Sequence, residues 1–339
     1  MTRFRDPHNI LVTGGAGFIG SNFVRYVLNN NPDVHITVLD ALTYAGNINN
    51  LNGLPEGRYT FVHGNICDAD LLDTLIPNHD TVINFAAESH NDNSIAQPDI
   101  FITSNIVGTF TLLQAVARHH IRFHQVSTDE VYGDTDYHDR SKFTQFSPYH
   151  PSSPYSASKA SADMLVQAWI RTYGVAATIS NSSNNYGPYQ HVEKFIPRQI
   201  TNLLSGRRAK LYGEGKEIRD WIAVEDNCSA IWQIVLHGTI GKTYLVSADC
   251  EKSNRDVLHS ILRLMGRAED DYDAVSNRPG VDRRYALNSD EIRKEFGWKP
   301  EFSNFEAGLQ DTIDWYAQHE EWWQSSKQAT EQKYAKEHH

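Results

Sequence analysis

The chain has 339 residues, of which 40% are hydrophobic and 22% are charged. Such a composition is typical of a globular protein, and the length suffices for one large core or for two domains sharing an interface. The 31 basic and 42 acidic residues give a formal charge of −11, which argues against nucleic acid or an anionic membrane as the main partner.

Other compositional features narrow the class of protein further. The three cysteines, Cys67, Cys228 and Cys250, have no metal-ligand spacing and indicate reduced thiols in the cytoplasm. The 16 histidines include no HExxH pair, so no metal is expected. The first residues lack the apolar core of a signal peptide, and we find no apolar run of ~18 residues, so no membrane span is expected.

Short apolar runs alternate with helix-length segments through the first half of the chain. This alternation predicts an α/β fold with a doubly wound parallel sheet of the Rossmann type. Strands are predicted at 10–13, 35–40, 59–64, 81–86, 122–127 and 176–180, and helices at 18–29, 101–119 and 155–173.

A glycine-rich turn follows the first predicted strand. Gly14, Gly17 and Gly20 permit a tight turn and close approach of the backbone to a pyrophosphate, and the helix that begins at Phe18 offers its free N–H groups to the phosphates. Asp40 ends the next strand, where a carboxylate accepts both ribose hydroxyls and repels a 2′-phosphate. The pattern predicts binding of NAD rather than NADP.

The pattern loosens after about residue 185. We therefore expect residues 1–185 to form the NAD-binding domain, with a segment near 222–240 returning to complete its sheet. Residues 186–339 are expected to form mainly a smaller α/β domain that binds the substrate. Within them, 224–236 has the pattern of a helix, and the polar tail at 311–337, with its three tryptophans, indicates a docked amphipathic helix.

Tyr155 and Lys159 are four residues apart and share one face of a predicted helix. Tyrosine has a pKa of ~10 and is a poor base at neutral pH, but a lysine one turn away lowers that pKa and can hydrogen-bond the nicotinamide ribose. Thr128, at the end of the preceding strand, is placed to bind the same substrate hydroxyl. These residues resemble the extended short-chain dehydrogenase/reductase family.

The two residues after Thr128 are Asp129 and Glu130. Adjacent acids in a loop are commonly just solvated. Beside a Tyr–Lys pair, however, they provide an acid for a leaving hydroxyl and a base for a carbon-bound proton. Oxidation, removal of water and reduction of one substrate are therefore indicated.

Within this family the chain is similar to the dTDP-glucose 4,6-dehydratases over nearly its whole length. The matching stretches are AAESH at 86–90, PSSPYS at 151–156, SNNYGPY at 183–189, EKFIP at 193–197, IRDW at 218–221, RPG at 278–280, DRRY at 282–285 and FGWKP at 296–300. This set is far more specific than any single motif.

The resemblance implies the conversion of dTDP-glucose to dTDP-4-keto-6-deoxyglucose and water. Tyr155, assisted by Lys159 and Thr128, is implied as the base at the sugar 4-hydroxyl during oxidation at C4. Glu130 is implied as the base at C5 and Asp129 as the acid for the C6 hydroxyl. NAD stays tightly bound and is regenerated by reduction at C6.

The resemblance also implies the contacts of both ligands. The cofactor contacts are Gly14, Gly17, Phe18, Ile19, Gly20, Asp40, Asn65, Ile66, Ala86, Ala87, Tyr155 and Lys159. The substrate contacts are Ser89, His90, Asn184, Glu193, Lys194, Phe195, Tyr212, Arg219 and Arg278. A homodimer through helices near 101–119 and 155–173 is implied as well, although their apolar faces fit an internal core equally.

Five positions depart from the family pattern. One is Gln145, where Glu is common. The other four are as follows. Asn65 stands where Asp is usual, Asn91 where an apolar residue is usual, and Asn227 and Val281 where His is usual. They bear on the nucleotide, so a 4,6-dehydratase of a CDP-, UDP- or GDP-linked sugar is the nearest alternative. A 4-epimerase or a decarboxylase is a second, and Asp129–Glu130 argues against the epimerase. A non-catalytic NAD-binding regulator is a third.

Overall fold

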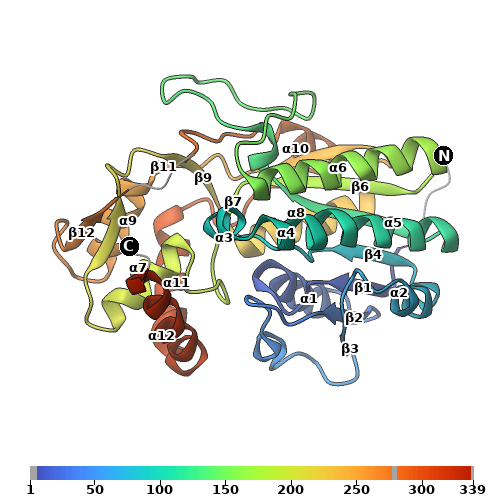
Figure 1. The fold of residues 1–339 in the computed structure, drawn as a ribbon, viewed down its shortest axis with the longest axis horizontal. Coiled ribbons are helices and arrows are strands. Elements are labelled where there is room, and N and C mark those ends of the chain that lie inside the picture. Colours follow the sequence, from blue (N-terminus) through green and yellow to red (C-terminus); the bar gives the residue numbers. More distant parts are fainter. Residues whose placement is uncertain (1–5, 277–280, 337–339) are drawn as a thin grey trace.

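The computed structural model describes residues 6–276 and 281–336 (Figure 1). Its centre is a sheet of seven parallel strands in the order β10-β6-β5-β4-β1-β2-β3. The strands are β1 Asn9–Thr13, β2 His35–Asp40, β3 Tyr59–His63, β4 Thr81–Asn84, β5 Arg122–Thr128, β6 Ala177–Ser182 and β10 Thr243–Val246. The strand order reverses between β1 and β4, which confirms the predicted doubly wound fold.

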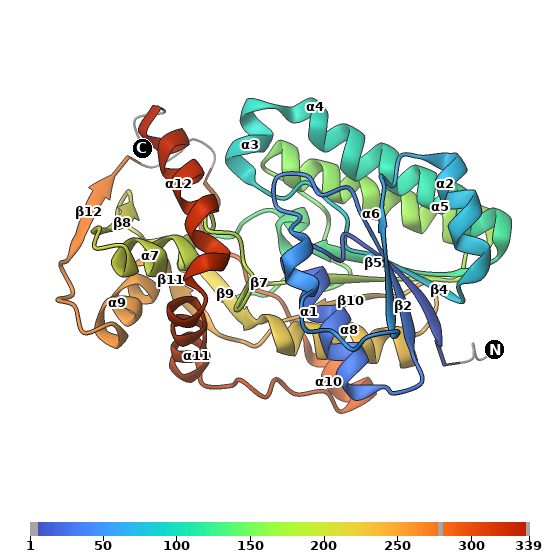
Figure 2. The same ribbon diagram turned by 90° about the horizontal axis from the view of Figure 1, so that it is seen from below.

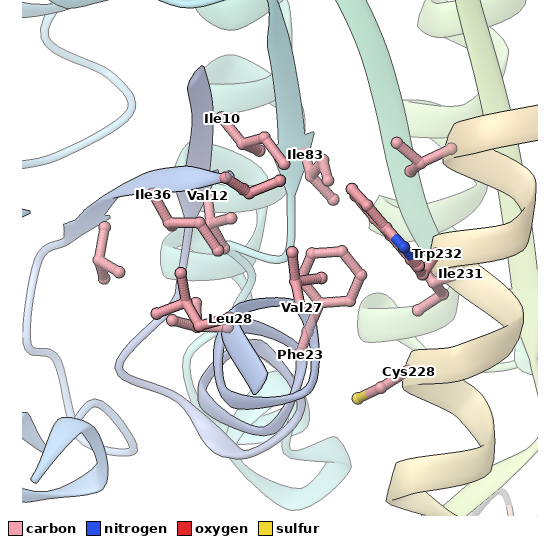
Figure 3. Packing of buried hydrophobic residues seen from close by; sticks show 14 of the residues in the cluster. Ile10, Val12, Phe23, Val27, Leu28, Ile36, Ile83, Cys228, Ile231 and Trp232 are labelled. Atoms are coloured by element: carbon pink, nitrogen blue, oxygen red, sulfur yellow. The ribbon is translucent and has the colours of Figure 1, made fainter. Parts of the chain in front are cut away.

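Helices cover both faces of the sheet (Figure 2). On one face lie α1 Phe18–Asn30, α8 Val224–His237 and α10 Asp290–Phe296, and on the other α2 Ala69–Leu75, α5 Gly108–His119 and α6 Pro154–Tyr173. Successive residues of a strand point to opposite faces, so Ile10 and Val12 pack against α1 and α8 (Figure 3), whereas Leu11 belongs to the core under α5 and α6. Burial on both faces explains why these strands read as continuous apolar runs.

The segment predicted as one helix at 101–119 is longer and composite. It comprises α4 Pro98–Phe101, a π-helical stretch η3 Ile102–Val107, and α5. By length and hydropathy alone, the span Pro98–His119 is long and apolar enough to cross a membrane. Half of the span is buried within the protein, as in a core helix, because Leu112, Leu113 and Val116 pack against the sheet.

The remaining elements lie beyond the carboxyl ends of the strands (Figure 1). The segment 222–240 holds mainly α8, which covers the sheet, and the strand completing the sheet is β10, just after it. The tail contains two helices, α11 and α12, rather than the single helix predicted. A three-stranded sheet, β11-β9-β7, and a two-stranded one, β12-β8, lie beside them.

The bounds of these elements complete the description. They are β7 Asn184–Tyr186, α7 Phe195–Leu204, β8 Ala209–Tyr212, β9 Ile218–Ala223, β11 Glu251–Ser253, α9 Asn254–Leu264, β12 Tyr272–Val275, α11 Phe305–Gln318 and α12 Glu320–Lys336. Short helices are η1 Ile48–Leu51, η2 Ile76–Asn78, α3 Asn91–Ala96 and η4 Asp129–Tyr132.

A substitution at Phe23 tests how α1 packs against α8 and the sheet. Its buried ring lies 5.0 Å from Phe85 and 6.2 Å from Trp232, measured between ring centroids. Phe23→Ala is expected to lower the free energy of unfolding by about 3–5 kcal/mol, because it leaves a cavity between helix and sheet. Phe146→Ala, at a side chain that is 86% exposed, is the matched control. Urea unfolding measures both, and equal stabilities would contradict this packing.

Candidate active site

The turn between β1 and α1 can be built only with small residues. Gly14 has a φ of +68°, and a Cβ on Gly20 would lie 2.3 Å from the Gly14 carbonyl oxygen. Gly17 caps α1 without a side-chain hydrogen bond, and the first turn contains no acidic residue. The N–H groups at the start of α1 are therefore available to an anion.

Asp40, at the end of β2, faces this turn. One carboxylate oxygen accepts the N–H of Ala16 at 2.9 Å and the other that of Leu42 at 2.8 Å. Burial raises the pKa of Asp40, while the two hydrogen bonds lower it. Each oxygen has a second lone pair, so the carboxylate can also accept ribose hydroxyls. Asp40 thus ties β2 to the glycine turn and lines the pocket beside it.

One pocket, of about 220 Å³, joins the glycine turn to the Tyr–Lys pair. Every residue expected at the cofactor lines it: Gly14, Gly17, Phe18, Ile19, Gly20, Asp40, Asn65, Ile66, Ala86, Ala87, Tyr155 and Lys159. The glycine cradle, the free helix N–H groups and the Asp40 carboxylate meet the needs of a pyrophosphate and a ribose. The residues therefore fit a dinucleotide.

The start of α6 positions Tyr155. Ser153 caps the helix in a capping box with Ser156, and Pro154 occupies the first turn. Tyr155 is buried in that turn, and Lys159, one turn later, donates from Nζ to the Val126 carbonyl oxygen at 2.8 Å. The two side chains thus line the pocket together from one helix face.

The pKa of Tyr155 differs from the sequence-based expectation. Burial raises it, the charges of Glu130 and Asp129 raise it further, and a hydrogen bond with Thr128 lowers it. We expected Lys159 to lower this pKa. Burial and the nearby carboxylates outweigh the lysine, whose ammonium is directed to a backbone carbonyl.

Asp163 was missed in the sequence, although it continues the Tyr155–Lys159 spacing by one more turn. Ser127 Oγ, Tyr149 OH and Asn181 Nδ2 donate to one of its oxygens at 2.7, 3.2 and 3.1 Å. Burial raises its pKa to about 6, against the opposing effect of Lys159. Asp163 is thus a buried counter-charge for the lysine, and its position on the helix face could have revealed it.

Asp129 and Glu130 occupy very different environments in η4. Asp129 is 2% exposed, and its Oδ2 accepts no hydrogen bond from any residue in 6–276 or 281–336. Burial raises its pKa well above the usual range, and the charge of Glu130 raises it further. Glu130 lines a pocket. Asp129 therefore holds a proton more tightly than an ordinary aspartate, beside a carboxylate that ligands can reach.

A second pocket, of about 210 Å³, holds the expected substrate contacts. Its lining includes Ser89, His90, Asn184, Glu193, Lys194, Phe195, Tyr212 and Arg219. Ser89 and Lys194 line both pockets, which are therefore adjacent. Arg278 lies outside the described residues. Thr128 and Asp129 are not among the lining residues of either pocket, and Asp129 is buried next to Glu130.

Four of the five departures from the family pattern have different surroundings. Asn65 lines the first pocket, and Asn91 and Val281 line the second. Asn227 lines neither: it is buried and accepts a hydrogen bond from Ser182 Oγ at 2.7 Å. A direct effect on ligands is thus confined to three of them.

Two further residues of the second pocket come from distant segments. The guanidinium of Arg198, in α7, lies 3.7 Å from the ring centroid of Tyr334, in α12. Both line the pocket. No local sequence signal links them, because the contact depends on how the C-terminal helix docks.

Comparisons with known proteins agree with this site. A family model described as GDP-mannose 4,6 dehydratase matches residues 11–312. A dTDP-glucose 4,6-dehydratase of Mycolicibacterium smegmatis is 56% identical over 96% of this chain and 98% of its own length. The chain belongs to the dTDP-glucose 4,6-dehydratase family. The extended short-chain dehydrogenase/reductase resemblance is thereby confirmed.

Solved structures of the same family superpose closely. The dTDP-glucose 4,6-dehydratase of Streptomyces venezuelae, with NAD bound, is 43% identical, with a TM-score of 0.90 over 94% of this chain and 99% of that one. The enzyme of Bacillus anthracis, also in complex with NAD, is 45% identical, with a TM-score of 0.88 over 94% and 99%. The family thus shares both pocket-forming parts of the fold.

Asp163→Asn tests the role of the buried counter-charge. Burial lowers the pKa of Lys159 and the charge of Asp163 raises it, so without that charge the lysine loses its proton at lower pH. The alkaline limb of the pH profile of turnover is expected to move down by about one unit. Asp33→Asn, at an exposed aspartate, should leave it in place. An unmoved limb in Asp163→Asn would show that the lysine charge is held otherwise.

Proposed function

We propose that this protein is a dTDP-glucose 4,6-dehydratase with one tightly held NAD. The observation that carries the proposal is the arrangement around Glu130. The pocket lined by the glycine turn, Asp40 and the Tyr–Lys pair adjoins a second pocket. Glu130 lines the second pocket, and its chain neighbour Asp129 is buried with a raised pKa. The 43–56% identity to dTDP-glucose 4,6-dehydratases supports the same activity.

Each residue around the sugar has a distinct proton to move. Tyr155 takes the proton of the 4-hydroxyl, with Thr128 hydrogen-bonded to it and Lys159 holding positive charge nearby. When bound, NAD supplies the hydride acceptor and donor and a positive charge in the pocket that Tyr155 lines. That charge opposes the effect of burial on the tyrosine.

The removal of water uses the carboxyl pair. A ketone at C4 makes the C5 proton acidic, and Glu130 removes it. Asp129, with its raised pKa, gives a proton to the departing C6 hydroxyl, which leaves as water. The Oδ2 atom of Asp129 is buried and has no hydrogen-bond partner among the described residues. A hydrogen bond with the C6 hydroxyl would supply one.

The nucleoside diphosphate is assigned to the second pocket. Lys194 and Arg219 line it, and Arg219 is held in place by donating to the carbonyl oxygens of Ile218 and Asp282 at 2.8 and 2.9 Å. The remaining guanidinium donors are free to contact phosphate oxygens. In this division of labour residues 1–185, with β10, hold NAD, and 186–339 hold mainly the nucleotide.

Incubation of the purified protein with dTDP-glucose, without added NAD, tests the function. Mass spectrometry is expected to find a product lighter by one water, since the cofactor travels with the protein. Water lost from CDP-, UDP- or GDP-glucose, but not from dTDP-glucose, would move the specificity to another nucleotide. Val281 is the residue that favours this alternative. It lines the second pocket, at a position where a histidine was expected from the resemblance. A product of unchanged mass would favour an epimerase.

Glu130→Gln is the informative variant in the same assay. Its sugar should be oxidised at C4 and still retain its water, because the C5 proton has no acceptor. Glu56→Gln, at an exposed surface glutamate, is the control and should behave as the unmodified protein. Normal dehydration by Glu130→Gln would assign the C5 proton to another group.

We also infer that the protein is a homodimer through η3, α5 and α6, and acts in the cytoplasm. Large apolar side chains are exposed on these neighbouring helices, including Ile102, Val107 and Phe110 on the first two and Met164 on the third. Phe110 packs edge-on against Trp169 of α6, which makes the apolar surface continuous between the helices. A second copy would cover it. The cysteines, all three free, fit a reducing compartment.

Light scattering tests the dimer. Val107→Asp and Met164→Asp each place a charge on the exposed apolar surface and are expected to give monomers that keep their helical circular dichroism. Ile240→Asp changes another exposed apolar side chain, away from these helices, and should stay dimeric. A dimer that survives both interface substitutions would place the contact on another surface.

A further inference from the structure

The carboxylate of Glu130 is held by a side chain that departs from the family pattern. Asn91, at the start of α3, donates from Nδ2 to Glu130 Oε2 at 3.0 Å. We propose that Asn91 is a positioning residue that keeps Glu130 ionised and directed for removal of the C5 proton. This inference rests on the function proposed above.

The orientation of the Asn91 amide follows from its neighbours. Ser153 Oγ, the cap of α6, accepts the Ser156 N–H at 3.0 Å, and Ser156 Oγ donates to the Ser153 carbonyl oxygen. The Ser153 hydroxyl proton is thus left to donate to Asn91 Oδ1, 3.0 Å away. An ionised carboxylate only accepts, so the amide nitrogen must face Glu130.

The network joins the two proton acceptors of the proposed reaction. Ser153 lies two residues before Tyr155 and starts the helix that carries it. Asn91 therefore ties Glu130 to the cap of the helix that carries Tyr155 through two hydrogen bonds. An apolar residue at position 91 could make neither bond.

An amide donor has a particular use beside Glu130. The charge of Glu130 is felt by Asp129 and by Tyr155, and it raises the pKa of both. Both groups therefore favour their neutral forms while Glu130 carries the charge. A hydrogen bond from an uncharged donor stabilises the carboxylate without neutralising it, so Glu130 stays basic enough to take a proton.

Other titratable groups face Glu130 from the surrounding elements, and a test has to hold them constant. They are Asp129 of η4, Tyr155 of α6, Tyr285, and, in the lining of the second pocket, His90, Asp92, Glu193, Lys194, Glu217 and Arg219. Asn91→Val leaves all of them in place and removes only the amide. Asn91→Asp keeps the shape and replaces the donor by a second acid.

Steady-state kinetics with dTDP-glucose test the positioning role. Asn91→Val is expected to lower kcat about 10- to 100-fold, the loss of one charge-assisted hydrogen bond, while KM changes by less than about twofold. The sugar oxidised at C4 but still carrying its water should accumulate in quenched samples, and Asn91→Asp should behave likewise. Gln97→Val, at the exposed end of the same helix, is the control and should match the unmodified protein.

A titration without substrate separates this inference from the proposed function. In protein with carbon-13 in its glutamate carboxyls, the Glu130 signal is identified by its absence in Glu130→Gln. Its midpoint should move to higher pH by about one to two units in Asn91→Val. An unmoved midpoint, or an unchanged kcat in Asn91→Val, would overturn the inference. Failure of the unmodified protein to dehydrate the sugar would overturn the function alone, because the titration would still decide the role of Asn91.

Discussion

The proposed chemistry depends on one contrast: Asp129 is buried, whereas Glu130 lines a pocket. Two adjacent carboxyl groups cannot both stay ionised in a poorly solvated site, and the more deeply buried one holds its proton. The short helix η4, which follows β5, creates this difference. In it the Asp129 side chain is buried, whereas Glu130 lines the second pocket. One dipeptide thus offers an acid and a base.

The elements around β5 extend the same electrostatic arrangement. Along α6 the buried face presents Tyr155, Lys159 and Asp163 at successive turns, so the lysine lies between the tyrosine and a buried counter-charge. The cap of that helix reaches Glu130 through Asn91. A hydrogen-bonded network that is at least partly buried is rigid because each unsatisfied polar group costs free energy. The oxidising and dehydrating groups therefore keep their relative places as the sugar reacts.

The parallel sheet explains why the two ligands meet at this place. The glycine turn follows β1, Asp40 ends β2 and Thr128 ends β5, so all three lie at the carboxyl edge of the strands where the strand order reverses. Open α/β sheets bind ligands at that edge. The substrate-binding elements stand over the same edge, and Ser89 and Lys194 contribute to both pockets.

Features with a local cause could be predicted from the sequence. The apolar run at 35–40 predicted both ends of β2 correctly, because the strand is buried on both faces. The spacing of the glycines, and that of Tyr155 and Lys159, predicted residues that line one pocket. Features that depend on three-dimensional packing could not. The raised pKa of Tyr155 comes from its enclosure, and Arg198 meets Tyr334 only after α12 has docked. The break of the helix predicted at 101–119 into α4, η3 and α5 also had no local signal in the sequence.

The most direct test of this account is the protonation state of Asp129 in the purified protein without substrate. Infrared difference spectra between the unmodified protein and Asp129→Asn at neutral pH report it. The account predicts a protonated carboxyl band that is present in the unmodified protein and lost in the variant. A carboxylate band lost in its place would show that Asp129 is ionised, and would leave the departing hydroxyl without its acid.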